Sequence, residues 1–292
     1  MRTVGCRCHS CIDDVALWMA ANRLQLNTSK TDLLWCSTSR RQSQLPCIPL
    51  RVGSDFISPS SSVLNLGIFL DADLTIRTHV QRTAAGGFAA LCKLRSIWRS
   101  VPTSVYQTLT VLLVVSRLDY RNSTLVRIPA NLSRHLQSVL NAAARSVAGL
   151  RRSDHITNTL ASFHWLPLRV PERIQFKLET LIYKSLHGLA PQYLIDDLRY
   201  VTDIPGRRRL RPASSFQLEV PRTRLVTVGD RTFSAAGSRL WNSLPRHVTE
   251  CQTLSLFFVE NSNISFLVCL SQDIDCMFVS LTWTLRFLLR PR

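Results

Sequence analysis

The sequence predicts a mostly helical α+β chain, in which a small antiparallel sheet precedes a helical bundle. Of its 292 residues, 46% are hydrophobic, which is enough for a chain of this length to bury a core. Before residue 74, short apolar runs alternate with Pro- and Ser-rich breaks, which is typical of short strands and turns. From residue 75 onward the apolar residues recur at helical spacing.

The N-terminal part predicts one helix and two or three short strands. Residues 11–27 carry apolar side chains near helical spacing, and the polar residues 27–30 predict the turn that follows. Short apolar runs at 33–36, 50–56 and 63–70 are rich in strand formers, so we expect antiparallel strands there.

Three longer helices are predicted between residues 102 and 188. The segment 102–118 is apolar around most of its circumference, which predicts a central core helix. In 131–148 the apolar residues form one stripe, with Asn131 as the expected N-cap and Gly149 as the expected left-handed residue after the end. Pro171 in a first turn and Gly188 after a last turn delimit the third helix.

The chain changes character twice after these helices. Residues 205–229 are basic and interrupted by prolines, so we expect an exposed connector before a short helix over 233–240. After about residue 257 charge becomes sparse, and we expect an unrelated, poorly ordered tail. The predicted parts are therefore 1–74, 75–204, 205–257 and 258–292.

The charge of the chain indicates a polyanionic partner. Lys and Arg number 36 against 19 Asp and Glu, a net charge of +17, and all but four of these cations are Arg. Guanidinium groups bind phosphates in bidentate fashion whatever the base sequence. A GC-rich coding sequence, which inflates Arg content without selection for binding, remains the alternative.

Cysteine usage and hydropathy predict a nuclear or cytoplasmic protein that is neither secreted nor in a membrane. The nine cysteines are an odd number, and the N-terminal residues contain no apolar secretory segment, so a disulfide framework is not expected. The most apolar stretch, 264–289, contains Asp273 and Asp275, each of which costs about 3 kcal/mol at a bilayer centre.

Two clusters near the N-terminus have side chains that bind metal ions. The first is a group of three Cys and one His within residues 6–11, which suggests zinc, but no second Cys or His pair follows that would complete a tetrahedral site. Asp13 and Asp14 are adjacent carboxylates, but their neighbours have helical spacing, so acids near a helix N-terminus are the better interpretation. The zinc candidates are Cys6, Cys8, His9 and Cys11.

No known catalytic or nucleotide-binding motif occurs in the chain. We therefore predict no catalytic residues, no metal or other cofactor and no small-molecule substrate.

The strongest binding signal is a basic ridge with an aromatic neighbour. Residues 91–165 contain ten Lys or Arg against Asp119 and Asp154, a local charge of +8. Basic side chains next to an aromatic ring suit a nucleic-acid backbone, although a solvated face in which Arg stems cover apolar surface is the simpler alternative. The run Arg207, Arg208, Arg209 and Arg211 is a weaker candidate that equally suits a nuclear-import patch. The predicted nucleic-acid-binding residues are Lys93, Arg95, Trp98, Arg99, Arg145, Arg151 and Arg152.

Eight strings occur in an order that one family shares. They are WMAANRLQLNTSKTDLL (18–34), LNLGIFLDADLTIRTHV (64–80), SRLDYRN (116–122), NAAAR (141–145), FHWLP (163–167), ERIQFKL (172–178), APQYL (190–194) and GDRTFSAAGSRLWNSLP (229–245). Together they resemble the C-terminal part of the reverse transcriptase of non-LTR, LINE-like retrotransposons of the jockey type, over about residues 11–257.

The resemblance implies the end of a polymerase palm, followed by a thumb and a C-terminal extension. The segment Leu26 to Thr31 would close the palm, and Leu66, Gly67 and Asp71 would belong to the primer-grip hairpin. The helices after residue 75 would grip a template–primer duplex of RNA and DNA.

The family's catalytic Tyr-x-Asp-Asp motif, which holds Mg²⁺, would precede this segment. We therefore expect a truncated RNA-directed DNA polymerase that is inactive alone and retains at most nucleic-acid binding. The alternative is a domesticated basic helical protein that binds nucleic acid or another partner and has no enzymatic role.

Overall fold

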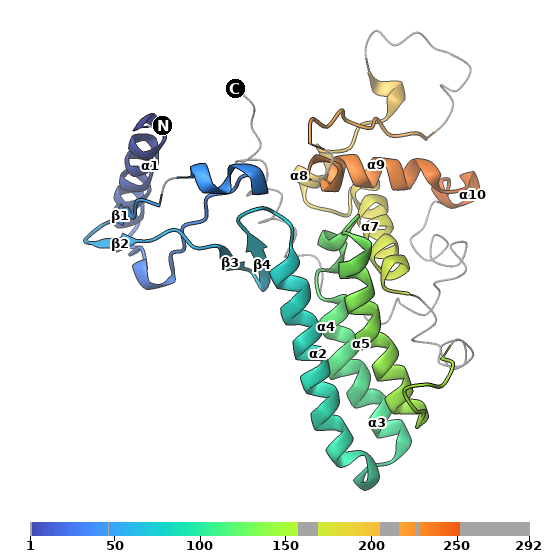
Figure 1. The fold of residues 1–292 in the computed structure, drawn as a ribbon. Coiled ribbons are helices and arrows are strands. Elements are labelled where there is room, and N and C mark those ends of the chain that lie inside the picture. The colour runs from blue at the N-terminus through green and yellow to red at the C-terminus, as the bar shows by residue number, and fades with distance from the viewer. Residues whose placement is uncertain (1, 46, 157–168, 205–215, 226–227, 252–292) are drawn as a thin grey trace. The chain divides into compact units, whose positions relative to one another are not determined.

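The computed structural model describes residues 2–45, 47–156, 169–204, 216–225 and 228–251. The fold is mostly helical α+β, as predicted, but its strands form two separate two-stranded antiparallel sheets where one small sheet was expected (Figure 1). It divides into two compact units, Met1–His79 and Val80–Arg292, which we describe separately. Among the described residues, no helix has the length and apolar character needed to cross a membrane.

The first unit contains one long helix and two β-hairpins. Helix α1 spans Arg2–Ala21, so it begins well before the predicted residue 11, and it ends in a turn where Arg23 adopts a left-handed backbone (φ 58°). Short 3₁₀ turns span Thr28–Lys30 and Ser39–Gln44. Strands β1 (Leu50–Val52) and β2 (Asp55–Ile57) pair with each other, as do β3 (Ser62–Asn65) and β4 (Ile68–Asp71).

All three strand predictions need correction. The run 50–56 is not one strand, because the chain turns at Gly53 (φ 62°) between β1 and β2. The run 63–70 is not a continuous strand but a hairpin, because Leu66 (φ 46°) and Gly67 (φ 83°) form a tight turn with two left-handed residues. The run 33–36 forms only an isolated bridge, between Leu33 and Pro59. The hairpins place Val52 and Ile68 in the core of this unit.

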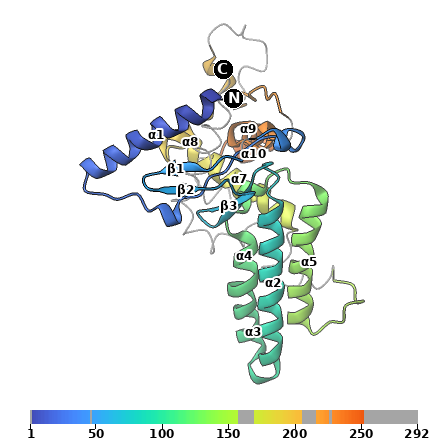
Figure 2. The same cartoon turned by 60° about the vertical axis from the view of Figure 1, so that its left-hand side comes forward.

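The second unit is built on a three-helix bundle (Figure 1, Figure 2). Helix α2 (Arg77–Ile97) begins in the first unit and is followed by a 3₁₀ turn, Trp98–Ser100. The chain then reverses through α3 (Thr103–Thr110), a π-helical segment (Val111–Val115) and α4 (Ser116–Asp119). A 3₁₀ turn, Asn122–Leu125, leads into α5 (Ala130–Ala148), which runs parallel to α2.

Helix α5 confirms the predicted apolar stripe. Gly149 has the predicted left-handed conformation (φ 66°) at the C-terminal end. The prediction that Asn131 caps the helix was wrong, because the helix begins at Ala130 after Pro129 and no side chain caps it. The buried residues are Leu132, Leu136, Val139, Leu140, Ala143, Ala144 and Val147.

The segment 102–118 is not the central helix that its composition predicted. Its π-helical turn leaves Leu112 56% exposed and Leu113 42% exposed, so only one face of the segment is buried. Helix α7 (Val170–Leu186) is buried over far more of its circumference than α3 and α4. Its buried residues are Val170, Arg173, Ile174, Phe176, Leu178, Glu179, Thr180, Leu181, Ile182, Tyr183 and Ser185.

Both ends of α7 follow the sequence signals. Pro171 lies in the first turn, and the Glu172 carboxylate accepts a hydrogen bond from the backbone N–H of Arg169 (2.9 Å). Gly188 (φ 70°) follows the last turn. Beyond it lie α8 (Gln192–Ile195), a 3₁₀ turn (Val201–Asp203), another 3₁₀ turn (Gly229–Arg231), α9 (Phe233–Ser243) and α10 (Arg246–Thr249).

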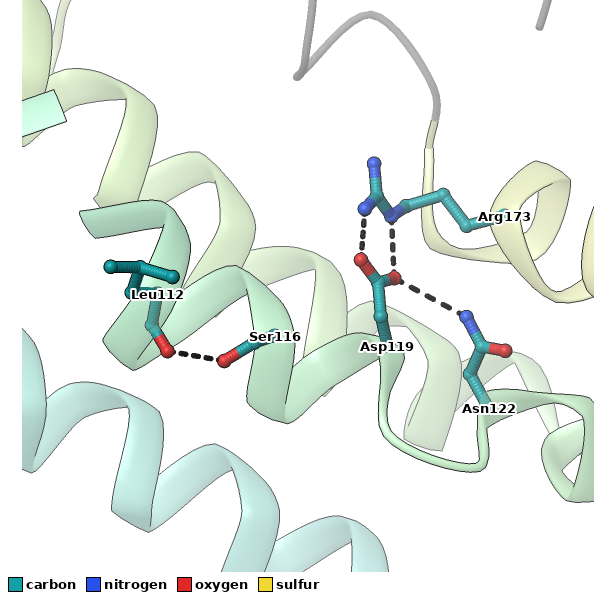
Figure 3. A network of polar contacts seen from close by, with 5 residues as sticks. All are labelled: Leu112, Ser116, Asp119, Asn122 and Arg173. Carbon is teal, nitrogen blue, oxygen red and sulfur yellow. Dashed lines mark hydrogen bonds and ion pairs between the residues drawn. The ribbon is translucent and has the colours of Figure 1, made fainter. Parts of the chain in front are cut away.

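A buried ion pair links the bundle to α7. The Arg173 Nε donates to Asp119 Oδ1 (2.7 Å), and a second guanidinium nitrogen, Nη2, donates to Oδ2. Figure 3 shows Asp119 at the end of α4 between Arg173 and the side chain of Asn122, whose amide also donates to Oδ1 (3.3 Å). Only 3% of the Arg173 side chain is exposed, so the pair is a bidentate contact in a largely dry environment.

The described part of the basic connector, 216–225, is exposed at half of its residues, as predicted, but it is anchored at Leu218. Leu218 is buried, and the Asn242 side chain on α9 bonds both its backbone N–H (2.8 Å) and its carbonyl (2.9 Å). Trp241 Nε1 donates to the carbonyl of Phe216 (3.0 Å). Residues 216–218 are therefore held against α9, whereas the run 207–211 and the tail 258–292 lie outside the described residues.

Candidate nucleic-acid interface

The structure gathers the predicted nucleic-acid-binding residues at one end of the three-helix bundle. Lys93 and Arg95 lie near the C-terminal end of α2, and Trp98 and Arg99 lie in the 3₁₀ turn that follows. Arg145 lies in the last turn of α5. The loop after that helix carries the two remaining cations, Arg151 and Arg152.

Two contacts bring the C-terminal ends of α2 and α5 and the start of α3 to the same level of the bundle. A Cβ added at Gly87 on α2 would lie 2.6 Å from Val139 Cγ1 on α5, so the two parallel helices approach closely at these positions. Eight residues further along each helix, about 12 Å at 1.5 Å per residue, Arg95 is level with Val147. The Tyr106 hydroxyl lies 2.5 Å from Ser146 Oγ, which brings the start of α3 to the same level.

We call this region the basic end, and define it by its six cations. Figure 1 and Figure 2 both show the C-terminal ends of α2 and α5 beside the start of α3. Tyr106 is a positioning residue that sequence reasoning missed, because its partner lies 40 positions away in the chain. The cations of the basic end are Lys93, Arg95, Arg99, Arg145, Arg151 and Arg152.

The basic end remains strongly positive after its local negative groups are counted. Asp154 is the one acidic residue in the segments 91–108 and 141–156, which form this end. The C-terminal dipoles of α2 and α5 contribute about −0.5 each and the N-terminus of α3 about +0.5, so the six cations leave about +4 to +5. Most of this positive charge is therefore not needed to balance the partial charges at the helix ends.

Asp154 organises the loop more than it neutralises the arginines. Its Oδ2 accepts the backbone N–H of Arg151 (2.7 Å), and its backbone carbonyl accepts a long hydrogen bond from Arg145 Nη2 (3.5 Å). The Nε of Arg145 is buried and bonds to no described residue. Arg151 and Arg152 are exposed, so their guanidinium groups can reach a ligand from this loop.

Trp98 gives the basic end an accessible aromatic surface. Its side chain is 45% exposed, and exposed Arg95 and Arg99 lie three residues before it and one after it. An exposed indole ring beside guanidinium groups can stack on a base while the cations contact the backbone.

The primer-grip-like residues divide into an exposed tip and a structural carboxylate. Leu66 and Gly67 form the turn of the β3–β4 hairpin, and Leu66 is 48% exposed. Asp71 is buried, and its Oδ2 accepts hydrogen bonds from Thr75 Oγ1 (3.2 Å) and from the backbone N–H of Thr78 (3.1 Å) in the first turn of α2. Asp71 therefore secures the start of α2, and is not free to contact a nucleic acid.

The acidic residues of α1 do not fit the Mg²⁺ site of the resembled family. Asp13 and Asp14 are exposed at successive helical positions, so their side chains point about 100° apart around the helix. They therefore do not converge on one ion, as an Asp pair in a strand–turn–strand can. The described residues contain no group of three or more His, Cys, Asp or Glu placed to hold a metal ion. Cys11 of the zinc candidates is exposed on α1, and the side chains of the other three lie outside the described set.

Exposed cations, one aromatic ring and a charge excess at a bundle end are thus the features that a partner would meet. No protein-family model, curated protein or solved structure matches this chain. Charge and geometry are therefore the observations from which a function can be inferred.

Proposed function

We propose that this chain binds nucleic-acid duplexes through the basic end, in the manner of the thumb of a non-LTR retrotransposon reverse transcriptase, and that it does not polymerise DNA by itself. The observation that carries the proposal is the convergence of six cations from separate segments of the sequence on one end of the bundle. The expected lack of polymerase activity is supported by the placement of the adjacent carboxylates Asp13 and Asp14 on a helix, where they do not both face one metal ion.

The chemistry of the basic end favours backbone contacts over base reading. Arginine forks pair with phosphate oxygens, and these contacts position a protein on a duplex without distinguishing sequences. The described residues 93–99 and 145–154 contain no Asn, Gln or Glu, the side chains that commonly read adenine and cytosine edges, and their arginines are needed for the phosphates. Binding should therefore be electrostatic and independent of sequence.

The test is the salt dependence of binding by the full chain. A labelled 20-base-pair DNA duplex and the matching RNA/DNA duplex are titrated by fluorescence anisotropy over a series of salt concentrations. Each phosphate neutralised on duplex DNA contributes about 0.9 to the slope of log affinity against log salt. Substituting both Arg95→Ala and Arg99→Ala should reduce that slope by about one to two, with no change in sequence preference.

The matched control removes two arginines from the opposite ends of the same helices. Arg82 on α2 and Arg134 on α5 are exposed, and Arg82→Ala with Arg134→Ala changes the net charge by the same amount. The control should keep the wild-type slope. An equal loss in both double variants, or wild-type binding that does not respond to salt, would refute the basic end as the interface.

A further inference from the structure

A second arginine site lies at the other end of the α3–α4 helix. Arg121 follows α4, about 25 Å along the helix axis from the start of α3 at 1.5 Å per residue. Its backbone is left-handed (φ 53°, ψ 26°), a conformation that residues other than Gly rarely adopt. The Thr124 backbone N–H (3.0 Å) and hydroxyl (2.9 Å) both donate to the Arg121 carbonyl and hold it there.

The guanidinium of Arg121 is buried and has no counter-charge in the described structure. None of its three nitrogens has an acceptor with hydrogen-bond geometry among the described residues, although all three are shielded from solvent; the neighbouring Tyr120 side chain is the one group that favours its charge. The Tyr120 ring covers one face, with its centroid 5.0 Å from Cζ. The nearest carboxylate in sequence, Asp119, is already engaged by Arg173 and Asn122. Burial lowers the pKa of Arg121, since the charged form loses hydration.

We propose that Arg121 is the main donor of an oxyanion-binding site in the loop between α4 and α5. A buried guanidinium keeps its charge, so its unpaired N–H groups destabilise the folded state unless oxygen atoms accept hydrogen bonds from them. An oxyanion such as phosphate or a carboxylate supplies both the acceptors and the opposite charge. A left-handed backbone that is held by neighbouring bonds is the kind of strain that concentrates at ligand sites. This site is separate from the basic end and does not depend on the proposed function.

The experiment is thermal unfolding of the full chain at pH 7 in buffers of matched ionic strength. Sodium phosphate is compared with sodium chloride, and sodium acetate forms a third series that distinguishes a carboxylate from a phosphate ligand. A ligand that binds only the folded state raises the melting temperature in a saturable way. We expect phosphate to do so in the wild-type protein, and Arg121→Gln to weaken its apparent affinity by at least about tenfold, which is the factor for one lost charge-assisted hydrogen bond.

Arg127→Gln is the matched control, because Arg127 is exposed in the same loop and also has a left-handed backbone (φ 55°). It should keep the wild-type response to phosphate. If Arg121→Gln does not fold, Arg121→Gly retains the left-handed conformation and replaces it in the comparison.

Three results would overturn the site. The first is an equal response to phosphate in wild type and the Arg121 variants. The second is no oxyanion response in the wild type. The third is an Arg121 variant that is more stable than wild type in every buffer, which would show that the unpaired guanidinium is only a source of instability. A response to acetate alone that requires Arg121 would identify the ligand as a carboxylate.

Discussion

Loss of the Asp119–Arg173 ion pair should be among the most damaging single changes in this protein. Asp119→Ala leaves the Arg173 guanidinium charged, 3% exposed and without the carboxylate that now bonds two of its nitrogens. Removing one partner of a buried ion pair costs about 3 to 5 kcal/mol. The Asp119 side chain retains 20% exposure, so water partly replaces it, and we expect about 3 kcal/mol. For a unit of this size that corresponds to a fall in melting temperature of about 6 to 12 °C.

The assay is urea unfolding of the full chain, followed by far-ultraviolet circular dichroism. The control is Asp196→Ala, because Asp196 is exposed and its partner is Gln192 one turn away (2.9 Å), so the change should cost less than about 0.5 kcal/mol. A double variant, Asp119→Leu with Arg173→Met, should recover most of the loss, since no unpaired charge then remains. The reasoning is refuted if Asp119→Ala matches the control, or if the double variant is no more stable than the single one.

Three further outcomes are expected. Gly87→Ala should destabilise the bundle by about 1 to 3 kcal/mol in urea unfolding, since the added Cβ would lie 2.6 Å from a carbon of α5. The control Ala85→Val, at an exposed position of α2, should cost under about 1 kcal/mol. Burial raises the pKa of the Cys36 thiol to about 11, so at pH 8 this thiol stays protonated. Mass spectrometry should therefore show slower alkylation by iodoacetamide at Cys36 than at exposed Cys92, and equal rates would contradict the burial of Cys36. The protein should not extend a primed template with deoxynucleotides and Mg²⁺ or Mn²⁺, and extension that Asp14→Ala abolishes would overturn its placement as a surface residue of α1.

The elements that the sequence predicted well are those whose patterns stay in phase. Helix α5 keeps one apolar stripe over 19 residues, so its buried face could be read directly. The segment 102–118 has similar apolar content, but a π-helical turn at 111–115 changes the phase, and Leu112 and Leu113 come to face solvent. Likewise, the turn in the run 63–70 requires a left-handed Leu66, which residue preferences disfavour.

The candidate site could be predicted residue by residue but not as an arrangement. Charge density pointed to residues 91–165, yet their convergence depends on the parallel alignment of α2 and α5. That alignment rests on the close approach of Gly87 to Val139, 52 positions apart, and the bond between Tyr106 and Ser146, 40 positions apart, adds the start of α3. Local periodicity carries no information about such pairs. Asp71 was also expected at a nucleic-acid contact, but its carboxylate bonds to the start of α2, so a structural role explains this residue without a ligand.

Because the basic end lies at helix C-termini, substitutions there change stability as well as binding, and two different measurements separate these effects. Cations near a helix C-terminus stabilise the helix by about 0.3 to 1 kcal/mol each, so removing Arg95 and Arg99 should lower stability by at most about 2 kcal/mol. A domain stabilised by about 5 to 15 kcal/mol remains folded after such a loss. Partial unfolding would reduce the fraction of active protein but leave the salt slope of the folded fraction unchanged. A reduced slope in the Arg95 and Arg99 double variant would therefore report lost phosphate contacts, whatever the variant does to the melting temperature.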